Sequence, residues 1–424
     1  MHDLRQIRDD LDLLRDAMRR REKLDQLAPY IDRIETLDRD RRSLIAATEE
    51  MKARRNEASQ EVARRKRAKE SADDLIARTR DLGDEIAGME ARLAEVEREL
   101  TAVLYELPNI PLPDVPAGGE EQNVVVAQWG EPRPREGVRP HWEIGARLGI
   151  IDLERAAKVT GSGFVFYRGQ GARLMRALQS FFLDLHAGRH GYEEVWPPLL
   201  VNRVTMTGTG QLPKFEDDLY RTSEDDLFLI PTAEVPVTNL YRDEIVPESA
   251  LPMAFVAYSK CFRREAGSAG KDTRGVLRTH EFDKVELVRY ATPESSGAQL
   301  ELLTGHAESA LRLLELPHRR KLLAAGDTSF ASAKTYDLEA WAPGVGAWLE
   351  VSSCSTFSDF QARRANIRFR PADGGKPRFV HTLNGSGLAF PRVVAAILEH
   401  HQRPDGTVAV PEALRPYFGA DVIG

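Results

Sequence analysis

The sequence is poor in cysteine and contains no long apolar run. Its 424 residues include only two cysteines, Cys261 and Cys354, which excludes a disulfide framework and a four-cysteine zinc site. No stretch reaches the ~18 apolar residues of a membrane span, and charges alternate at the N-terminus where a signal peptide would be apolar. These absences predict a soluble protein of a reducing compartment, the cytoplasm, with no membrane partner.

An excess of positive charge is also missing. The formal net charge is −7, which excludes a uniformly basic nucleic-acid coat but leaves room for a local basic surface. Hydrophobic residues make up 42% of the chain, enough for a substantial core. At roughly 150 residues per domain, the length predicts two or three domains.

Glycine and proline are absent between Ile31 and Leu82, where good helix formers predominate. Mostly apolar residues follow a spacing of three and four, as in a coiled-coil seam. The upstream, rougher seam is Leu24, Leu27, Ile31, Ile34, Leu37, Leu44, Ala47 and Met51, and the downstream seam is Leu75, Thr79, Leu82, Ile86, Met89, Leu93, Val96, Leu100 and Val103. Ser71 followed by Asp74 resembles a capping box that would start the second helix near residue 72. We therefore expect an antiparallel helical hairpin at about residues 30–105, within an arm of residues 1–110.

The tip of this predicted hairpin is strongly basic. Its cationic residues are Lys52, Arg54, Arg55, Arg64, Arg65, Lys66, Arg67 and Lys69, against only two acidic ones, Glu57 and Glu61. A charge run of this kind is often only a solvated helix face. At the end of a projecting rod it also suits a phosphate backbone. Both interpretations stay open at this point.

Prolines and glycines follow the arm and predict a linker. They are Pro108, Pro111, Pro113, Pro116, Gly118 and Gly119. Short alternating runs with glycine, proline and aromatic residues then continue to the end of the chain. Residues 111–424 are therefore expected to form one mixed α/β domain.

The residues that could carry chemistry lie between 232 and 392. Two alternating runs, 255–265 and 279–288, predict an antiparallel hairpin with a long, flexible, glycine-containing loop. Period two places Arg263 and Glu265 on one face, and His280, Phe282, Lys284 and Glu286 on one face of the return strand. Such a face is a poor core but a good floor for a ligand with a phosphate, a flat base and an ammonium group. The loop 267–272 does not satisfy the P-loop spacing.

Several long motifs resemble those of seryl-tRNA synthetases, which are class II aminoacyl-tRNA synthetases. Residues 262–275 and 282–286 are similar to motif 2, 382–389 with Arg392 to motif 3, and 181–197 to motif 1. Segments 208–215 and 232–236 resemble the serine site, and 350–355 with 359–364 resemble the metal and ATP strand. The resemblance implies an α+β fold: an antiparallel catalytic sheet flanked by helices in residues 111–424, preceded by a coiled-coil tRNA-binding arm in residues 1–110.

The implied reaction is ATP-dependent activation of L-serine to seryl-adenylate and transfer to tRNA(Ser), and also to tRNA(Sec). The implied enzyme is a homodimer joined through motif 1, uses Mg²⁺, and needs no zinc. The residues implied for catalysis are Arg263, Glu286 and Arg392. Serine would be bound by Thr232, Ala233, Glu234, Arg263, Glu286 and Ser386. ATP would be bound by Arg263, Arg264, Glu265, Phe282, Glu350, Val351, Ser352, Ser353 and Arg392. The tRNA would be bound by Arg54, Arg55, Arg64, Arg65, Lys66, Arg67 and Lys69.

Individual roles follow from the same resemblance. Arg263 would bridge the α-phosphate and the serine carboxylate, and Arg392 would hold the γ-phosphate. Glu265 would accept from the adenine amino group, and Phe282 would stack on the base. Glu286 and Ser386 would meet the serine hydroxyl, and Thr232 and Glu234 the amino group.

Two local expectations concern backbone geometry. Glu350 and Ser353, the implied Mg²⁺ ligands, would point to opposite faces of a regular strand, so a strand end or bulge is expected near Ser352. Proline at position 391 is expected to start a helix with Arg392 on its first turn. Arg264, Glu281 and the Phe390-Pro391 pair depart from the family's common residues.

Three alternatives stay open from the sequence. Related catalytic domains activate amino acids for carrier proteins, but those lack a long arm. A non-catalytic tRNA-binding homologue would be expected to lose Arg263, Arg392 or Glu286, which are all present. A specialised duplicate conferring antibiotic tolerance would carry the same motifs as a housekeeping enzyme.

Overall fold

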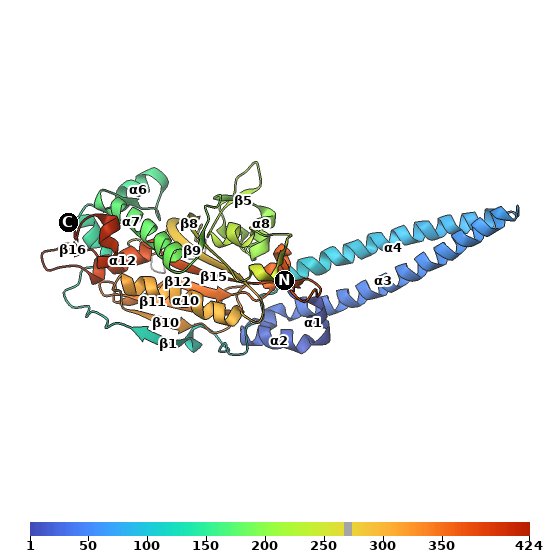
Figure 1. Cartoon of the computed structure of the whole chain (residues 1–424), viewed down its shortest axis with the longest axis horizontal. Coiled ribbons are helices and arrows are strands. Elements are labelled where there is room, and N and C mark those ends of the chain that lie inside the picture. Colours follow the sequence, from blue (N-terminus) through green and yellow to red (C-terminus); the bar gives the residue numbers. More distant parts are fainter. Residues whose placement is uncertain (267–273) are drawn as a thin grey trace. The chain divides into compact units, whose positions relative to one another are not determined.

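The computed structural model describes residues 1–266 and 274–424. The chain forms two compact units (Figure 1). One comprises residues 2–19 and 23–108, and the other comprises Met1, residues 20–22 and residues 109–424. Most of the glycine-containing loop, including the segment tested against the P-loop spacing, falls at 267–273 and lies outside the described residues.

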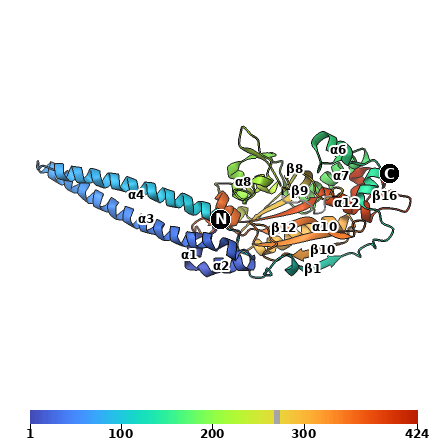
Figure 2. The same ribbon diagram turned by 180° about the vertical axis from the view of Figure 1, so that it is seen from behind.

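The first unit is dominated by two long helices, α3 (Leu24–Arg67) and α4 (Asp73–Tyr105), which lie side by side (Figure 2). Ion pairs join the two helices, from Arg33–Glu99 at 2.5 Å to Lys52–Glu90 at 2.9 Å. The residue numbers rise along α3 and fall along α4, so the helices are antiparallel. Every residue of the two predicted seams is buried or half-buried. The predicted coiled-coil hairpin is therefore confirmed.

The ends of the hairpin differ in detail from the prediction. Helix α4 begins near residue 72 as expected, but the capping box is wrong. Ala72 occupies the N-cap position without a side-chain cap, and the Ser71 hydroxyl donates instead to the Asp73 carboxylate at 3.1 Å. Two short helices that the sequence analysis did not predict, α1 (Leu4–Asp9) and α2 (Leu11–Arg20), precede the hairpin.

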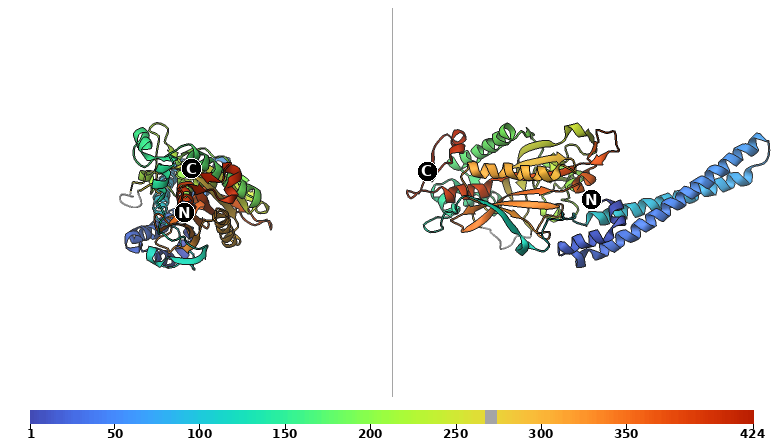
Figure 3. Two further views of the ribbon diagram at one scale, coloured as in Figure 1. Left: turned by 90° about the vertical axis from the view of Figure 1, so that its left-hand side faces the viewer. Right: turned by 60° about the horizontal axis from the view of Figure 1, so that its bottom comes forward.

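The second unit is built on an eight-stranded sheet whose neighbouring strands are antiparallel, except for the parallel β8–β4 pair. In spatial order the strands are β1 (Val124–Trp129), β10 (His318–Leu322), β11 (Lys334–Ala342), β12 (Ala347–Thr356), β15 (His381–Ala389), β9 (Glu281–Ala291), β8 (Met253–Phe262) and β4 (Glu193–Glu194). Helices α7 (Gln170–Asp184), α10 (Ser296–Leu313) and α12 (Phe390–His400) pack against it, and Figure 3 shows α10 along one face. The predicted α+β architecture, an antiparallel sheet flanked by helices, is confirmed.

Shorter elements complete this unit. The helices are α5 (His141–Arg147), α6 (Leu153–Thr160), α8 (Arg203–Thr209), α9 (Glu234–Thr238), α11 (Phe360–Ala365) and α13 (Arg415–Phe418). The strands are β2 (Ile151–Asp152), β3 (Phe166–Tyr167), β5 (Leu200–Asn202), β6 (Leu227–Leu229), β7 (Ile245–Pro247), β13 (Arg368–Arg370), β14 (Arg378–Phe379), β16 (Val408–Ala409) and β17 (Val422–Ile423). The remaining short turns are η1 (Glu120–Gln122), η2 (Leu185–Arg189), η3 (Glu216–Asp218), η4 (Glu248–Ala250) and η5 (Glu412–Leu414).

The two faces of the central strands have different partners. On β9, Val285 and Leu287 are fully buried in the main core with Leu303 of α10. On β15, a Cβ added to Gly385 would lie 2.3 Å from the Leu303 side chain and 2.9 Å from the Cys354 sulfur, so glycine leaves room for α10 to pack against the strand. Because side chains alternate along a strand, residues 284, 286, 384 and 386 are turned to the opposite face.

The predicted linker forms no regular element at first but is anchored to the second unit. The Asn109 amide donates to the carbonyls of Ala331 and Phe357, both at 2.8 Å. Arg21, only 1% exposed, donates to the carbonyls of Asn109 and Ser332. Burial lowers the pKa of this guanidinium to about 10. In the part of the chain that the structure describes, no helix is long and apolar enough to cross a membrane.

Candidate active site

A cleft of about 800 Å³ lies over the face of the sheet opposite α10. Twelve residues implied by the family resemblance line it: Thr232, Glu234, Arg263, Glu265, Phe282, Glu286, Glu350, Val351, Ser352, Ser353, Ser386 and Arg392. Two implied residues do not line it. Ala233 is fully buried in an apolar cluster behind the cleft, and Arg264 contributes its backbone N–H to the carbonyl of Asp218 at 3.0 Å.

The β8–β9 hairpin supplies the floor of the cleft, as the sequence predicted. Arg263 follows directly after β8, and its guanidinium lies 5.1 Å from the ring centroid of Phe282 on β9. Its Nε donates to the carbonyl of Pro231 at 3.3 Å. His280, which precedes β9, does not line the cleft; its Nδ1 lies 3.0 Å from the carbonyl oxygen of Arg263, and its ring centroid lies 5.4 Å from that of Phe164.

Glu265 adopts a left-handed backbone conformation with φ of 51°. Its carboxylate accepts a hydrogen bond of 2.6 Å from Arg278. A φ of this kind is uncommon for residues other than glycine and is found where surrounding structure holds the chain in place. Glu265 therefore lines the cleft from a left-handed position beyond the end of β8 and not as part of the regular strand.

One end of the cleft is closed by a buried polar cluster centred on Glu286, which is 1% exposed. The Lys284 ammonium forms an ion pair with Glu286 and donates to the Thr232 hydroxyl at 2.8 Å. Thr232 donates to one carboxylate oxygen of Glu286 at 3.3 Å, and Asn384 donates to the other at 3.1 Å. The cluster presents hydroxyl, ammonium and carboxylate groups, a set that suits a small polar zwitterion.

Glu234 lies beside this cluster, at the start of α9, and is 8% exposed. Burial, and then the nearby Glu286 carboxylate, raise its pKa to about 7. The side-chain amide of Gln361 opposes that shift with a hydrogen bond of 2.7 Å to Oε1 of Glu234. The pKa of the Glu234 carboxyl group is thus close to neutral pH, and perturbed pKa values of this kind are common at binding and catalytic sites.

The expected bulge is present in β12. Leu338 on β11 pairs with Ser352, whereas Glu339 pairs with Glu350, so Val351 is the extra residue. The bulge places Glu350 and Ser353 on one face, opposite Glu339 and Asp337, which are two residues apart on β11. The prediction of a bulge near Ser352 is confirmed.

The same region has the donors that a hard divalent cation prefers. Glu350 and Ser353 contribute oxygen to the cleft, and buried Asp337 is hydrogen-bonded to Ser353. Burial and then the Glu350 carboxylate raise the pKa of Asp337, and among the described residues its buried Oδ1 has no hydrogen-bond partner. These oxygen donors fit the chemistry of Mg²⁺. No group of three or more His, Cys, Asp or Glu side chains within the described ranges is arranged to bind a metal alone.

Arg392 lies on the first turn of α12, which has Pro391 near its start, as predicted. Its guanidinium donates to the backbone carbonyl of Glu350 at 2.7 Å and to that of Leu277 at 3.2 Å. These bonds hold a cationic fork at the mouth of the cleft, beside the oxygen donors of β12.

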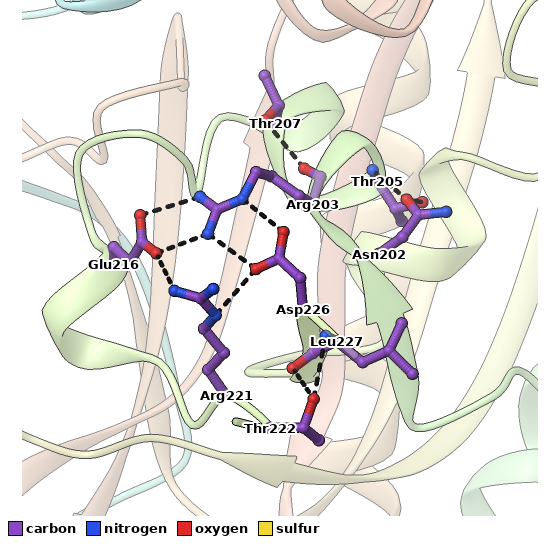
Figure 4. Close-up of polar contacts among 9 residues, drawn as sticks. All are labelled: Asn202, Arg203, Thr205, Thr207, Glu216, Arg221, Thr222, Asp226 and Leu227. Atoms are coloured by element: carbon purple, nitrogen blue, oxygen red, sulfur yellow. Dashed lines mark hydrogen bonds and ion pairs between the residues drawn. The ribbon is translucent and has the colours of Figure 1, made fainter. Parts of the chain in front are cut away.

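A ring of four charged residues braces another wall (Figure 4). Arg203 pairs with Glu216 at 2.7 Å and Asp226 at 2.9 Å, and Arg221 pairs with the same two carboxylates at 3.2 and 2.8 Å. This ring holds η3, whose Asp218 accepts from the backbone N–H groups of residues 264 and 266. The segment that carries Asp218 is thereby bonded to the backbone on both sides of Glu265.

Four further residues, to which the sequence motifs gave no role, contact predicted site residues: Lys284, Asn384, Gln361 and Arg278. Lys284 had been placed on the correct strand face, since it alternates with Phe282 and Glu286. Asn384 is two residues before Ser386 on β15, so the same alternation could have found it. Gln361 lies in the segment 359–364 that resembles the family's metal and ATP strand, but neither Gln361 nor Arg278 is related to its partner by a periodic spacing.

Comparison with known proteins gives a consistent result over the whole chain. Residues 1–111 match the family model of the seryl-tRNA synthetase N-terminal domain, and residues 214–401 match that of the tRNA synthetase class II core domain (G, H, P, S and T). The chain is 63% identical to a serine–tRNA ligase of Gemmatimonas aurantiaca, over 100% of both proteins.

Solved structures agree with this match. A seryl-tRNA synthetase from Pyrococcus horikoshii complexed with ATP is 37% identical with a TM-score of 0.95, covering 100% of this chain and 99% of that one. A cytoplasmic serine–tRNA ligase from Naegleria fowleri in complex with AMP is 28% identical with a TM-score of 0.89, covering 100% and 98%.

Proposed function

The chain belongs to the seryl-tRNA synthetase family, and from this premise we propose how its cleft performs a two-step reaction. The protein is a class II serine–tRNA ligase that attaches serine to tRNA for protein synthesis, with ATP as a substrate. In the first step, a serine carboxylate oxygen attacks the α-phosphorus of ATP, and the bond to pyrophosphate breaks. In the second, a hydroxyl of the terminal tRNA ribose takes the seryl group and AMP leaves.

The activation step needs fixed positive charge, because negative charge gathers around the α-phosphorus during attack. We assign Arg263 to the α-phosphate and serine carboxylate, where a planar guanidinium can contact both. Arg392 would hold the γ-phosphate. Glu350 and Ser353 would hold Mg²⁺, which when bound neutralises phosphate charge and orients the leaving pyrophosphate. The 5.1 Å approach of Arg263 to Phe282 supports a shared adenylate site.

Nucleotide recognition falls to the hairpin. Phe282 would stack on adenine, and Glu265 would accept from its amino group. The backbone of Val351 and Ser352 passes through the cleft wall beside them. Arg264 does not line the cleft, so we expect its contribution to ATP binding to be smaller than that of Arg263.

Serine selection would occur at the buried cluster. Glu286 and Ser386 would pair with the serine hydroxyl, and Thr232 and Glu234 with the ammonium group, while Ala233 shapes the wall from behind. If the amino acid alanine entered in place of serine, Glu286 and its partners would have no hydroxyl to bind. A site built around hydrogen bonds strongly rejects an analogue that lacks the bonded group. The single observation that carries the proposal is this buried carboxylate, 1% exposed, in the same cleft as Arg263.

The finer biological assignments are also proposals. Residues 1–110 would bind tRNA through the basic tip, and residues 111–424 would be the catalytic domain. The substrates would be tRNA(Ser) and tRNA(Sec). The protein would act as a cytoplasmic homodimer joined through residues 181–197. The long arm supports tRNA over a carrier protein as the acceptor.

The test is pyrophosphate exchange into ATP measured with each of the twenty amino acids, followed by charging of tRNA(Ser) and tRNA(Sec) transcripts. We expect exchange with serine alone and acylation of both tRNAs. Exchange driven by a different amino acid would overturn the assignment of the cleft. Serine exchange without tRNA charging would favour a carrier-protein acceptor instead.

A further inference from the structure

Gln361 is a fully buried polar side chain behind the wall of the cleft, and no role has been assigned to it above. It is the second residue of α11 and makes three side-chain hydrogen bonds. Its Nε2 donates to Oε1 of Glu234 at 2.7 Å and to the backbone carbonyl of Thr209 at 3.2 Å. Its Oε1 accepts from the Thr382 hydroxyl at 2.7 Å.

These partners determine which way the amide faces. The backbone carbonyl of Thr209 can only accept a hydrogen bond, so the amide nitrogen must point toward it. The same nitrogen then presents its second N–H to Glu234, while the Thr382 hydroxyl satisfies the amide oxygen. Flipping the amide would bring two oxygen acceptors against its oxygen atom. Gln361 is therefore a built-in donor aimed at one oxygen of Glu234.

An amide donor stabilises the carboxylate form of its partner, because the charged form accepts more strongly. Glu234 needs this help: burial and Glu286 on β9 both favour its neutral form. Lys284 on β9 and Arg263 after β8 act in the opposite direction, with Gln361. Arg364, also on α11, donates to the backbone carbonyl of Leu212 at 3.2 Å and is not among the charged groups that shift the pKa of Glu234.

We propose that Gln361 is a positioning residue for serine binding, which holds the Glu234 side chain in place and in its charged form so that it can accept from the substrate's ammonium group. The inference rests on the proposed function, in which Glu234 binds that group. Helix α11 thereby contributes to the affinity for the amino acid through Glu234, although Gln361 itself does not contact the substrate.

The main test is the pH dependence of serine affinity in Gln361→Met, which keeps the side-chain length and removes the donor. Serine KM is measured by pyrophosphate exchange between pH 6 and pH 9. We expect the acid limb of kcat/KM for serine to move up by about one pH unit, which corresponds to about a fivefold rise in serine KM near pH 7 and approaches tenfold at pH 6. By pH 9 the variant should approach the wild type, with kcat and KM for ATP changed less than about twofold throughout.

Two further variants separate the possible outcomes. Glu234→Gln should raise serine KM at every pH, and adding Gln361→Met to it should change KM no further, because the amide then has no carboxylate to stabilise. Should Gln361→Met fail to fold, Thr382→Val, which removes only the hydroxyl holding the amide oxygen, should give a smaller shift in the same direction.

The possible failures are distinguishable. If Glu234→Gln leaves serine KM unchanged, the proposed role of Glu234 is wrong, and this inference falls with it. If Glu234→Gln raises KM but the folded Gln361→Met or Thr382→Val variant keeps the wild-type pH profile, this inference alone is wrong. Full additivity in the double variant would likewise assign Gln361 a purely structural role and overturn it.

Discussion

The guanidinium of Arg392 lies 3.4 Å from the carboxylate of Glu350 and donates to the backbone carbonyl of the same residue at 2.7 Å. The cation proposed for the γ-phosphate and the carboxylate proposed for Mg²⁺ are thus held side by side, on α12 and β12. Because Arg392 and Glu350 would act on the same triphosphate, a change to the Glu350 carboxylate should alter the concentrations of Mg²⁺ and ATP that the enzyme requires.

Glu350→Gln keeps the shape of the side chain and removes its charge. We expect about a tenfold rise in the Mg²⁺ concentration that gives half-maximal pyrophosphate exchange, since a neutral amide is a poorer ligand for a hard cation. Serine KM should stay within about twofold. The matched control is Glu339→Gln, which alters the carboxylate paired with Glu350 across the strands. An unchanged Mg²⁺ requirement in Glu350→Gln would remove this residue from the metal site.

Arg263→Ala should abolish serine-dependent exchange, by about 10³-fold or more, because it removes the guanidinium aimed at the reacting phosphate. The fold should survive, since the Arg263 side chain contacts mainly Pro231 and Phe282 at the cleft surface. Arg263→Lys should recover little, because an ammonium cannot contact two groups in the plane of a fork.

The neighbouring Arg264 provides the comparison. Its side chain is exposed and does not line the cleft, so Arg264→Ala should reduce exchange by less than about tenfold, as expected for a residue away from the reacting atoms. Exchange and melting temperature are measured for both variants. Near-normal exchange in Arg263→Ala would contradict its catalytic role, and equal losses in the two variants would contradict the distinction between them.

Periodic features of the sequence predicted the structure well. The seam from Leu75 to Val103 identified the coiled coil because every third or fourth side chain must face the partner helix. The alternation of Phe282 and Glu286 identified the cleft face, and the roles that the resemblance implied for Glu350 and Ser353 predicted a strand end or bulge near Ser352, which is found at Val351. In each case the information lies within one short segment.

Features that depend on packing between distant segments were not predicted. Arg21 is buried by carbonyl groups more than 80 residues away in the chain, and an isolated arginine near the N-terminus gives no sign of such partners. Gln361 reaches Glu234 across 127 residues. The predicted capping box of Ser71 and Asp74 was wrong for a different reason, because the Ser71 hydroxyl donates to the neighbouring Asp73 carboxylate.

Three histidines beside α7 and α10 predict a pH-dependent stability. The Nδ1 atoms of His186 and His190 are 3.0 Å apart, and the rings of His190 and His306 are stacked at 4.0 Å. Burial is the largest cause that lowers all three pKa values, to about 3 for His186 and about 4 for His306. These groups are neutral in the folded protein, whereas the unfolded chain takes up protons near pH 6.5.

Because the unfolded state binds more protons between about pH 6.5 and pH 4, the free energy of unfolding should fall as the pH is lowered through this range. His186→Met keeps an apolar volume there and removes one titration. The difference in urea midpoint between pH 7.5 and pH 5 should be smaller for this variant than for the wild type. Identical differences would show that His186 does not contribute to acid sensitivity.

Shortening the arm should separate the two steps of the reaction. Arg41 on α3 and Glu97 on α4 form an ion pair of 2.9 Å, so residues 42–96 can be replaced by a short glycine–serine linker while the helices remain joined. We expect serine-dependent exchange to stay within about threefold of wild type, as for a substitution remote from the cleft, and tRNA charging to be lost. Charging that survives the deletion would contradict the proposed tRNA contact.

The basic tip contains two kinds of cation. Lys52, Arg54 and Arg64 form ion pairs with Glu90, Glu50 and Glu61. Within the described part of the chain, no ion pair involves Lys66, Arg67 or Lys69, which are all exposed. Unpaired ammonium and guanidinium groups are the ones free to displace counterions from phosphates. The second triplet is therefore expected to carry more of the tRNA affinity than the first.

Changing Lys66, Arg67 and Lys69 together to glutamine should weaken tRNA binding and reduce the slope of log affinity against log salt by about two to three. The matched variant changes Lys52, Arg54 and Arg64 to glutamine, removes the same charge, and should reduce the slope less, since each of these cations already has a carboxylate. Basic residues in the last turn of α3 also stabilise that helix end, so helicity is measured by circular dichroism for both. If the salt slope is unchanged while helicity is intact, the basic tip does not bind tRNA and is only a solvated surface.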